Sequence, residues 1–505
     1  MQKRVKIIAT LGPATEIHGG LKFGEDGFWD RPIDLESTSD NIADLIKAGV
    51  NIFRFNFSHG THDEHAQKME CVRMAEQKTG QKVGFMLDTK GPEIRTELFE
   101  NGEKQFDYQT GDQIRVITKQ GVKSTRDKIA LNVAGNIDIF DYVEPNQQIL
   151  IEDGKLGLRI TSKDDSAREL IVTVENSGAI ADQKNVNIPG TKIPFPALDE
   201  RDEGDIRFGL GEGINYIAIS FSRSANDINV VRAILAETGN DQVKLIPKIE
   251  NREGLENLDQ ILAVSDGVMV ARGDMGTEVP FEMVPVYQKH IIKKANIAGK
   301  PVITATNMLE SMTSKPRATR AEISDVFNAV IDGTDATMLS GESANGLYPR
   351  ESVATMAKVD RLAQDELPEF GRFSLEGFTT DTHAKQIALS VREAAQHGQV
   401  KAVVVYTETG ESAQTVAQYR PDADILAVTF DEKIQKSLMP VYGVEPIVDR
   451  QPTDSDDMFA RAEELAQQYG LANVGDDIII VAGVPVGHGH TNTLRVHTIS
   501  EKYEF

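Results

Sequence analysis

The chain has 505 residues but only one cysteine, one tryptophan and 6% aromatic side chains. Because a single cysteine, Cys71, cannot form an internal disulfide, the fold must depend on buried apolar surface, and a reducing compartment is expected. The longest uncharged apolar run, residues 478–486, is far shorter than the ~20 residues of a membrane-spanning helix. Residues 1–12 are typical of a first strand and not of a signal peptide. We therefore expect a cytoplasmic protein without a membrane partner.

Positive charge is also scarce. The chain has 54 Lys and Arg residues against 78 Asp and Glu residues, which gives a formal net charge of -24. A field of this sign repels nucleic acid and anionic membranes, so both are excluded as partners. A small anionic substrate would still bind if a pocket gathered a local cluster of Lys and Arg. The length exceeds that of a single compact core and predicts two to four domains.

Short runs rich in Val and Ile alternate with helical patterns, which is typical of parallel βαβ units. The expected strands are residues 5–11, 51–57, 83–87, 216–221, 244–249, 267–271, 301–305 and 336–339. Eight such strands predict an α/β fold of the (β/α)8 TIM-barrel type. In the helix before the second strand, Ser39 or Asp40 is the expected N-cap, and Gly49 is the expected end.

Two further regions differ from the barrel pattern. Residues 92–195 alternate strands and turns, with a hairpin at 149–158 around Asp153-Gly154, and predict an inserted β-barrel-like lid domain. Residues 367–505 predict a C-terminal α/β regulatory domain with strands at 402–406, 425–429 and 477–482, which leaves 1–91 and 196–366 for the catalytic barrel. The loop 16–36, which carries Trp29, is interpreted as a surface loop, with a subunit contact as the alternative.

Polar side chains gather where the expected barrel strands end, which is where barrel enzymes carry their chemistry. Strand alternation places Arg54, Asn56 and Ser58 on one face of the second strand and three phenylalanines on the other. Lys248 and Glu250 share a face at the end of the fifth strand, where an internal ion pair is the alternative interpretation. The other strand ends carry Gly273, Asp274, Thr306, Ser340 and Glu342. Glu250 and Asp274 together offer carboxylate oxygens suited to Mg²⁺.

The chain resembles the pyruvate kinase family in stretches that follow the barrel in order. The most specific are Asp-Thr-Lys-Gly-Pro-Glu-Ile-Arg at 88–95 and Lys-Ile-Glu-Asn at 248–251. The other matching stretches are residues 6–13, 51–60, 270–274, 305–312, 319–322 and 338–342. The resemblance implies transfer of a phosphoryl group from phosphoenolpyruvate to ADP, giving pyruvate and ATP. The inserted and C-terminal domains fit the same family plan.

The resemblance also implies roles for individual residues. Substrate binding falls to Arg54, Lys248, Gly273, Asp274 and Thr306. The cofactors are Mg²⁺ (or Mn²⁺) at Glu250 and Asp274, and K⁺ at Asn56, Ser58, Asp88 and Thr89. The nucleotide contacts are Asn56, His59, Arg95 and Lys184. The catalytic set is Lys248, Arg54, Thr306, Ser340 and Glu342, of which the last three help to protonate the enolate.

Assembly and control follow from the resemblance as well. A homotetramer is expected, with Arg320 near a subunit contact. A sugar-phosphate effector would bind at Thr407, Thr409, Gly410 and Ser412, with residues 487–493 as a second wall. The alternative is an ordinary strand-to-helix turn, and the nearby carboxylates of Glu408 and Glu411 would repel phosphate unless they point outward.

Three alternatives stay open at the level of sequence. Glu93 adds a carboxylate that a bound K⁺ would balance, but it would equally pair with Lys90 or Arg95. A metal-dependent aldolase or lyase acting on pyruvate-like acids would use a similar barrel rim without needing Lys248. A catalytically inactive scaffold is the non-enzyme alternative, and the intact set of proposed ligands argues against it.

Overall fold

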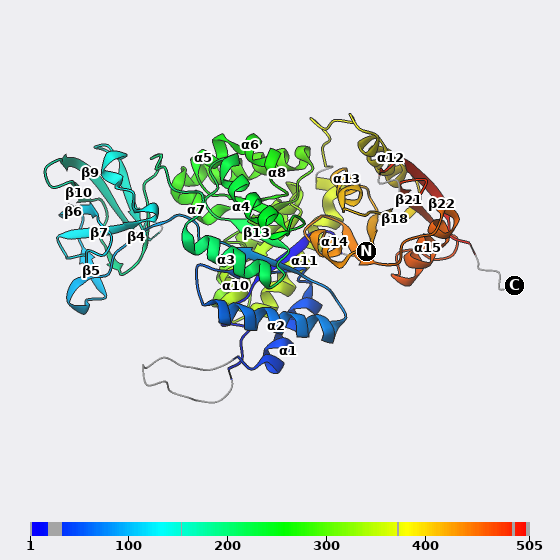
Figure 1. Ribbon diagram of the computed structural model, residues 1–505, viewed down its shortest axis with the longest axis horizontal. Helices are drawn as coiled ribbons and strands as arrows, with labels where there is room; N and C mark the ends of the chain where they lie inside the picture. The colour runs from blue at the N-terminus through cyan, green and yellow to red at the C-terminus, as the bar shows by residue number, and fades with distance from the viewer. Residues whose placement is uncertain (1–2, 19–32, 153, 371–372, 487–489, 501–505) are drawn as a thin grey trace.

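The computed structural model describes residues 3–18, 33–152, 154–370, 373–486 and 490–500. The molecule is elongated, with an inserted β-domain at one end, a barrel in the middle and a C-terminal α/β domain at the other end (Figure 1). Most of the loop 16–36, including Trp29, lies outside the described residues. No helix in the described part of the chain is long and apolar enough to cross a membrane.

Eight parallel strands close into the central barrel, as the sequence predicted. In chain order they are β1 (Lys6–Thr10), β2 (Ile52–Asn56), β3 (Gly84–Asp88), β13 (Tyr216–Ile219), β14 (Lys244–Ile249), β15 (Val268–Ala271), β16 (Val302–Ala305) and β17 (Ala336–Leu339). The surrounding helices are α1 (Leu35–Ala48), α2 (His62–Thr79), α3 (Glu200–Gly211), α4 (Ala225–Thr238), α5 (Arg252–Glu256), α6 (Leu258–Val264), α7 (Arg272–Glu278), α8 (Val284–Ala298), α9 (Arg320–Ile331), α10 (Gly341–Ala344) and α11 (Pro349–Phe370).

The start of α1 differs from the prediction. Its N-cap is Asp34, whose side chain accepts the N–H of Ser37 at 3.1 Å, so both Ser39 and Asp40 were wrong as caps. Ser39 lies inside the helix with its side chain buried, because the first turn begins five residues earlier than the apolar stripe indicated. The predicted end at Gly49 is confirmed, and this glycine has a φ of 123°.

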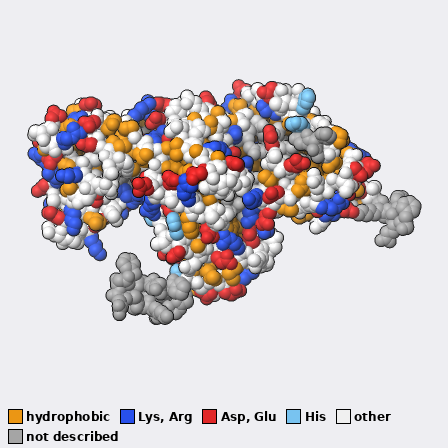
Figure 2. Space-filling model, in the orientation of Figure 1, with side chains coloured by type: hydrophobic (Ala, Val, Ile, Leu, Met, Phe, Trp, Pro, Cys, Tyr) orange, Lys and Arg blue, Asp and Glu red, His pale blue; other side chains and the backbone are white. Residues whose placement is uncertain are grey.

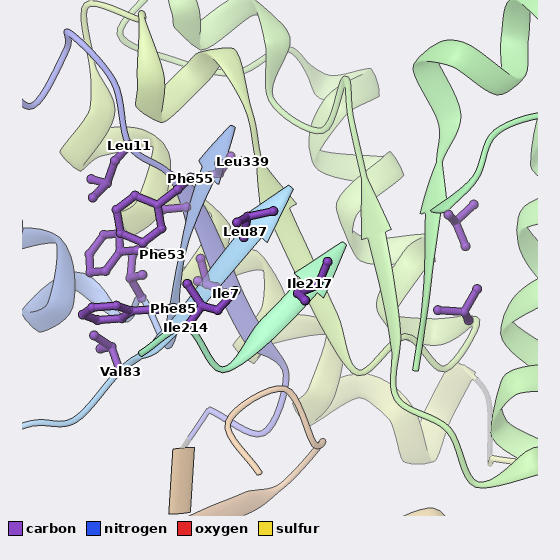
Figure 3. Close-up of a cluster of buried hydrophobic side chains, with 14 of the residues drawn as sticks. Ile7, Leu11, Phe53, Phe55, Val83, Phe85, Leu87, Ile214, Ile217 and Leu339 are labelled. Carbon is purple, nitrogen blue, oxygen red and sulfur yellow. The ribbon is translucent and has the colours of Figure 1, made fainter. Parts of the chain in front are cut away.

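Apolar side chains fill both the inside of the barrel and the layer beneath its helices. Phe53 and Phe55 of β2, and Phe57 just past its end, lie in the helix layer, where the first two pack with Phe85 and Leu87 (Figure 3). A separate interior cluster ends at the amino-terminal side of the barrel with Met439 from the C-terminal domain.

The floor of the barrel is thus formed partly by the C-terminal domain. The hydroxyl of Tyr216 donates to the carbonyl oxygen of Lys436, and the ammonium of Lys6 donates to the carbonyl oxygen of Val444 at 2.6 Å. Residues at opposite ends of the sequence therefore meet beneath the barrel.

The inserted domain is a second, smaller closed barrel with the strand order β10-β6-β7-β4-β12-β8-β9. Its strands are β4 (Ile94–Thr96), β6 (Gln113–Thr118), β7 (Lys128–Val133), β8 (Gln148–Ile151), β9 (Leu156–Asp164), β10 (Glu169–Val174) and β12 (Asn185–Asn187), with a separate pair β5 (Gln105–Tyr108) and β11 (Gly178–Ala181). The predicted hairpin is confirmed as the antiparallel pair β8 and β9, although Asp153 of its turn lies outside the described residues.

The C-terminal domain contains a five-stranded sheet in the order β20-β19-β18-β21-β22. Its strands are β18 (Val400–Tyr406), β19 (Asp424–Thr429), β20 (Val444–Val448), β21 (Asp477–Ala482) and β22 (Thr493–Thr498), and its helices are α12 (His383–His397), α13 (Glu411–Gln418), α14 (Glu432–Ser437) and α15 (Ser455–Gln468). The three predicted strands are β18, β19 and β21. The edge strands β20 and β22 were not predicted.

Candidate active site

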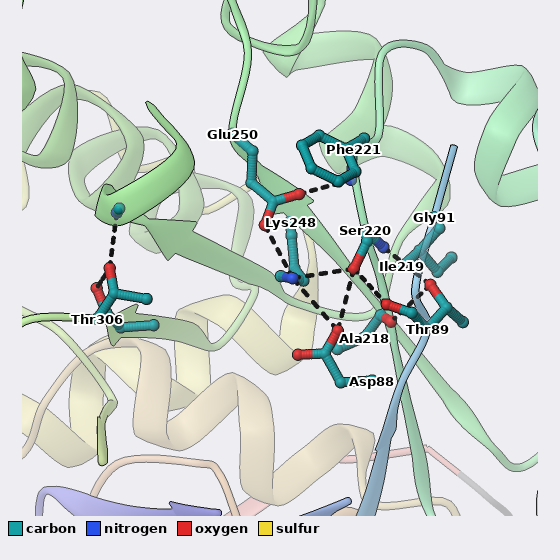
Figure 4. A network of polar contacts seen from close by, with 12 residues as sticks. Asp88, Thr89, Gly91, Ala218, Ile219, Ser220, Phe221, Lys248, Glu250 and Thr306 are labelled. Atoms are coloured by element: carbon teal, nitrogen blue, oxygen red, sulfur yellow. Dashed lines mark hydrogen bonds and ion pairs between the residues drawn. The ribbon is translucent and has the colours of Figure 1, made fainter. Parts of the chain in front are cut away.

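Four charged side chains meet at the carboxyl ends of β2, β3 and β14. The ammonium of Lys248 lies 2.8 Å from Glu250 Oε1 and 3.3 Å from Asp88 Oδ1. The other oxygen of Asp88 accepts from Arg54 Nε at 2.6 Å. Ser220, just past the end of β13, accepts from Lys248 at 2.9 Å and donates to the Thr89 carbonyl at 2.6 Å (Figure 4). The sequence therefore brings two cations and two carboxylates together at the barrel rim.

Burial makes the electrostatics of this network strong. Although burial alone would lower the pKa of Lys248, the charges of Asp88 and Glu250 outweigh it and raise that pKa above its usual value. Burial raises the pKa of Glu250 to about 7, with Asp274 adding to the increase and Lys248 opposing it. Burial would also raise the pKa of Asp88, but Arg54 and Lys248 hold it below its usual range. Lys248 therefore stays charged at neutral pH, and Glu250 is close to its midpoint.

A second group lies at the ends of β15 and β16. The backbone N–H of Gly273 donates to Thr306 Oγ1 at 2.8 Å, and this contact stands apart from the Lys248 network in Figure 4. Gly273 is exposed, and Asp274 is half-buried in the first turn of α7, where its charge acts on Glu250. Thr306 adopts a left-handed backbone with a φ of 66°.

Glu342 is fully buried behind this second group. Its two carboxylate oxygens accept the backbone N–H groups of Leu309 at 2.9 Å and Ser340 at 2.8 Å. Glu342 therefore ties the turn after β16 to the turn after β17. Ser340 is half-buried at the start of α10.

The residues predicted to hold a monovalent cation lie around the end of β2 and β3. Asn56 is half-buried, and its Oδ1 accepts the backbone N–H of Ser58 at 3.1 Å. The buried hydroxyl of Thr89 accepts the N–H of Ser220 at 3.1 Å. His59 is exposed one residue beyond Ser58.

The lid-side residues make ion pairs of their own. Arg95 Nε lies 2.6 Å from Glu93 Oε2, and Lys90 Nζ lies 3.8 Å from the same oxygen. Lys184 lies 3.1 Å from Glu152. In this structure Glu93 thus forms the pairs that the alternative interpretation expected.

A cavity between the inserted domain and the barrel opens beside Asp274. Its lining includes Asn187, Phe221, Asp274 and Glu278. Asn187 Nδ2 donates to Glu278 Oε1 at 3.0 Å, and burial, aided by Asp274, raises the pKa of Glu278. Sequence reasoning missed Ser220, Asn187 and Glu278. Only Ser220 had a signal, since it lies in a predicted strand end like the residues that were found.

The predicted effector turn borders a cavity in the C-terminal domain. The Thr407 hydroxyl accepts the Gly410 N–H at 2.9 Å, Thr409 lines the cavity, and Ser412 contacts Thr491 at 2.5 Å between hydroxyl oxygens. Glu408 and Glu411 also line it, and no described lining residue is a lysine or arginine. Residues 487–489 of the expected second wall lie outside the described residues.

On the face drawn in Figure 2, Lys and Arg side chains are interspersed with Asp and Glu along the whole molecule. This face carries no continuous basic surface. The cations that matter for the site are therefore those gathered at the rim, Arg54 and Lys248.

Comparison with known proteins gives matches to pyruvate kinases in sequence and in structure. A family model described as the barrel domain of pyruvate kinase matches residues 2–353, and one described as its alpha/beta domain matches residues 385–497. The pyruvate kinase of Lactococcus lactis subsp. lactis is 60% identical over 501 residues, which cover 99% of this chain and 100% of that protein. The pyruvate kinase of Geobacillus stearothermophilus is 42% identical and covers 99% of this chain and 81% of that protein. A crystal structure of a pyruvate kinase from Cryptosporidium parvum superposes with a TM-score of 0.87 at 33% identity, covering 98% and 96% of the two chains. The chain belongs to the pyruvate kinase family.

Proposed function

We propose that this chain transfers the phosphoryl group of phosphoenolpyruvate to ADP, giving pyruvate and ATP. The observation that carries the proposal is the buried cation of Lys248, held between Asp88 and Glu250 beside Arg54. Phosphoryl transfer requires positioning and charge neutralisation more than covalent chemistry, and a fixed cation supplies both. Arg54 holds the phosphate of the substrate, and Lys248 stabilises the charge of the group in transfer.

The rest of the substrate binds at the second group. The backbone of Gly273 and Asp274, in the first turn of α7, and the hydroxyl of Thr306, which accepts the Gly273 N–H, hold the carboxylate of phosphoenolpyruvate. Thr306 and Ser340 lie on the side from which the enolate takes its proton. Glu342 supports them by fixing both turns, because its two oxygens are already bound to backbone N–H groups.

Glu250 and Asp274 would hold the Mg²⁺ (or Mn²⁺) ion. The fit is supported by Glu250, a buried carboxylate whose pKa is raised to about 7 and whose Oε1 lies 2.8 Å from the ammonium of Lys248. In the described part of the chain, no group of three or more His, Cys, Asp or Glu side chains forms a metal cluster. Two protein carboxylates leave room for substrate oxygens and water, as is usual for Mg²⁺. When bound, the ion would neutralise charge on the substrate oxygens.

Asn56, Ser58, Asp88 and Thr89 would hold K⁺ beside the phosphate site. Their side chains offer hard oxygen ligands at, or just past, the carboxyl ends of β2 and β3. A monovalent cation there would offset the negative charge of substrate and nucleotide.

Arg95 and Lys184 of the inserted domain, with Asn56 and His59 of the barrel, would contact ADP and ATP. Their pairing with Glu93 and Glu152 keeps both cations at the lid side of the cleft. Closure of this domain, which we assign to residues 92–195, would exclude water and prevent hydrolysis of the transferred group. We assign the barrel to residues 1–91 and 196–366.

We further propose a homotetramer and a regulatory role for residues 367–505. Backbone N–H groups at the start of α13 and the hydroxyls of Thr407, Thr409 and Ser412 suit a sugar phosphate. Glu408 and Glu411 oppose it, so the effector would need to displace their side chains from the cavity. Sedimentation and substrate saturation curves with and without sugar phosphates test both points, and unchanged curves would remove the effector site.

The first experiment mixes the protein with phosphoenolpyruvate, ADP, Mg²⁺ and K⁺ and measures pyruvate. We expect pyruvate and ATP in equal amounts, with no product when ADP is left out. Release of pyruvate without ADP would instead support the lyase or aldolase alternative.

A further inference from the structure

We propose that Arg272 is a positioning residue for the reaction, because its guanidinium holds Thr306 in a left-handed backbone that keeps the threonine hydroxyl beside Gly273, at the proposed carboxylate site. The inference rests on the proposed role of Thr306 in binding the substrate carboxylate. Arg272 itself is not placed in contact with substrate.

The turn after β16 is strained where it carries the substrate-binding hydroxyl. Thr306 has a φ of 66° and Asn307 a φ of 54°, so two consecutive non-glycine residues are left-handed. For a β-branched residue such as threonine, this conformation is rare and costly. Strain of this kind persists only where surrounding contacts hold it, and it is typical of functional sites.

The contacts that hold the turn come mainly from one side chain. Arg272 Nη2 donates to the carbonyl oxygen of Thr306 at 2.6 Å, and Nε lies 3.2 Å from the carbonyl oxygens of both Ala305 and Thr306. Nη2 also contacts the sulfur of Met308 at 2.8 Å. These donors fix the orientation of the peptide groups on either side of Thr306.

The far side of the guanidinium is anchored to the helix layer. Nη1 donates to Asp325 Oδ1 on α9 at 2.8 Å and to Gln288 Oε1 on α8 at 3.2 Å. The side chain of Arg272 is only 10% exposed. A planar group with five donors can satisfy both sides at once, whereas a lysine ammonium cannot span them.

The residue after Arg272 also contacts the Thr306 side chain. Gly273 follows Arg272 directly, and its N–H donates to Thr306 Oγ1 at 2.8 Å. Arg272 therefore joins the ends of β15 and β16 into one unit, in which backbone orientation and hydroxyl direction are set together. Loss of the guanidinium would leave the Thr306 turn free to relax to a right-handed or extended conformation.

The test compares Arg272→Met, Arg272→Lys and Thr306→Ser, alone and combined, in steady-state assays that vary phosphoenolpyruvate and ADP separately. We expect Arg272→Met to raise KM for phosphoenolpyruvate by ~10-fold or more, because small misplacements of a substrate-binding group have effects of this size. KM for ADP should stay unchanged, and Arg272→Lys should not restore the loss. The matched control is Arg207→Met, which removes an exposed arginine of α3 paired with Glu203 and Glu237.

A rescue experiment separates positioning from general stabilisation. Serine keeps the hydroxyl but lacks the β-methyl group that makes the left-handed backbone costly. Thr306→Ser should therefore lower KM for phosphoenolpyruvate when the double variant is compared with Arg272→Met alone. If Arg272→Met does not fold, Asp325→Asn, which loosens the anchor alone, should give a smaller rise in the same KM.

Two results would overturn the proposal. The first is a KM for phosphoenolpyruvate that is the same in folded Arg272→Met as in an active wild-type enzyme. If Arg272→Met does not fold, the same comparison is made with Asp325→Asn. The other is a rise shared equally by both substrates with no rescue by serine. A wild-type enzyme that makes no pyruvate would instead refute the proposed function, so the two failures are distinguishable.

Discussion

Replacing Lys248 by methionine removes the cation at the centre of the rim network while keeping most of the length of the side chain. Its ammonium lies 2.8 Å from Glu250, 3.3 Å from Asp88 and 2.9 Å from the hydroxyl of Ser220. For a cation placed on a transferring phosphoryl group, we expect turnover to fall by ~10³ or more, which corresponds to about 4 kcal/mol.

The same substitution changes the electrostatics that remain. Lys248 opposes the rise in the pKa of Glu250, so without it that pKa will increase further above about 7. Glu250 will then be protonated at neutral pH and bind Mg²⁺ weakly, with recovery as the pH rises. While both carboxylates are ionised, loss of the buried pair should cost roughly 3–5 kcal/mol of folding stability.

The assay must therefore separate metal binding from chemistry. Pyruvate formation is measured at saturating Mg²⁺, at neutral pH and at about pH 9, where Glu250 is more ionised. Lys244→Met is the matched control, because Lys244 begins the same strand and only approaches Asp266 at 3.9 Å. Turnover of folded Lys248→Met within tenfold of the wild type at high pH and saturating metal would refute the proposed role.

Three further predictions concern the cations and Gly91, which lies next to the inserted domain. Replacing K⁺ with a bulky organic cation at equal ionic strength should lower turnover strongly, and Glu93→Lys should make activity less sensitive to that replacement. Full activity without a small monovalent cation would contradict the proposed K⁺ site. Because burial raises the pKa of Glu250 to about 7, protons should compete with Mg²⁺ below that pH. Calorimetry should show that the affinity for Mg²⁺ decreases as the pH is lowered in the wild type but not in Glu250→Gln. Gly91 has a φ of 74°, and an added Cβ would lie 2.8 Å from Cβ of Ser220, so Gly91→Ala should lower turnover as well as stability. The control is Gly102→Ala, where φ is 75° and no atom lies within 4 Å of the added Cβ, so it should lower the free energy of unfolding only by the ~1–3 kcal/mol of backbone strain. Equal turnover in Gly91→Ala and Gly102→Ala would show that the contact with Ser220 does not affect turnover.

The barrel and its rim were predictable because one pattern encodes both. A parallel strand buried on both sides must be apolar, so polar residues such as Arg54 and Lys248 become visible where the strands end. Edge strands give a weaker signal. β20 contains Pro446, which is tolerated because, among the described residues, this strand pairs with β19 alone. β22 is an exposed antiparallel edge, and its mixed residues show no apolar run.

Contacts that depend on backbone conformation were not predictable. Nothing in the sequence indicates that Thr306 is left-handed, and Arg272 gains its role only because of that turn. Likewise, the pairing of Asn187 with Glu278 joins residues 91 positions apart across two domains. Such contacts follow from how elements pack, and local patterns do not record them.

The barrel floor makes the C-terminal domain part of the fold of the catalytic domain. Met439 closes the interior cluster, Tyr216 and Lys6 donate to backbone carbonyls of that domain, and these contacts lie at the end of the barrel opposite the rim network of Lys248. A fragment that ended after α11 would expose apolar interior and leave the buried ammonium of Lys6 without its carbonyl partner. We therefore expect the barrel and the C-terminal domain to unfold together, whereas the inserted barrel has a hydrophobic core of its own.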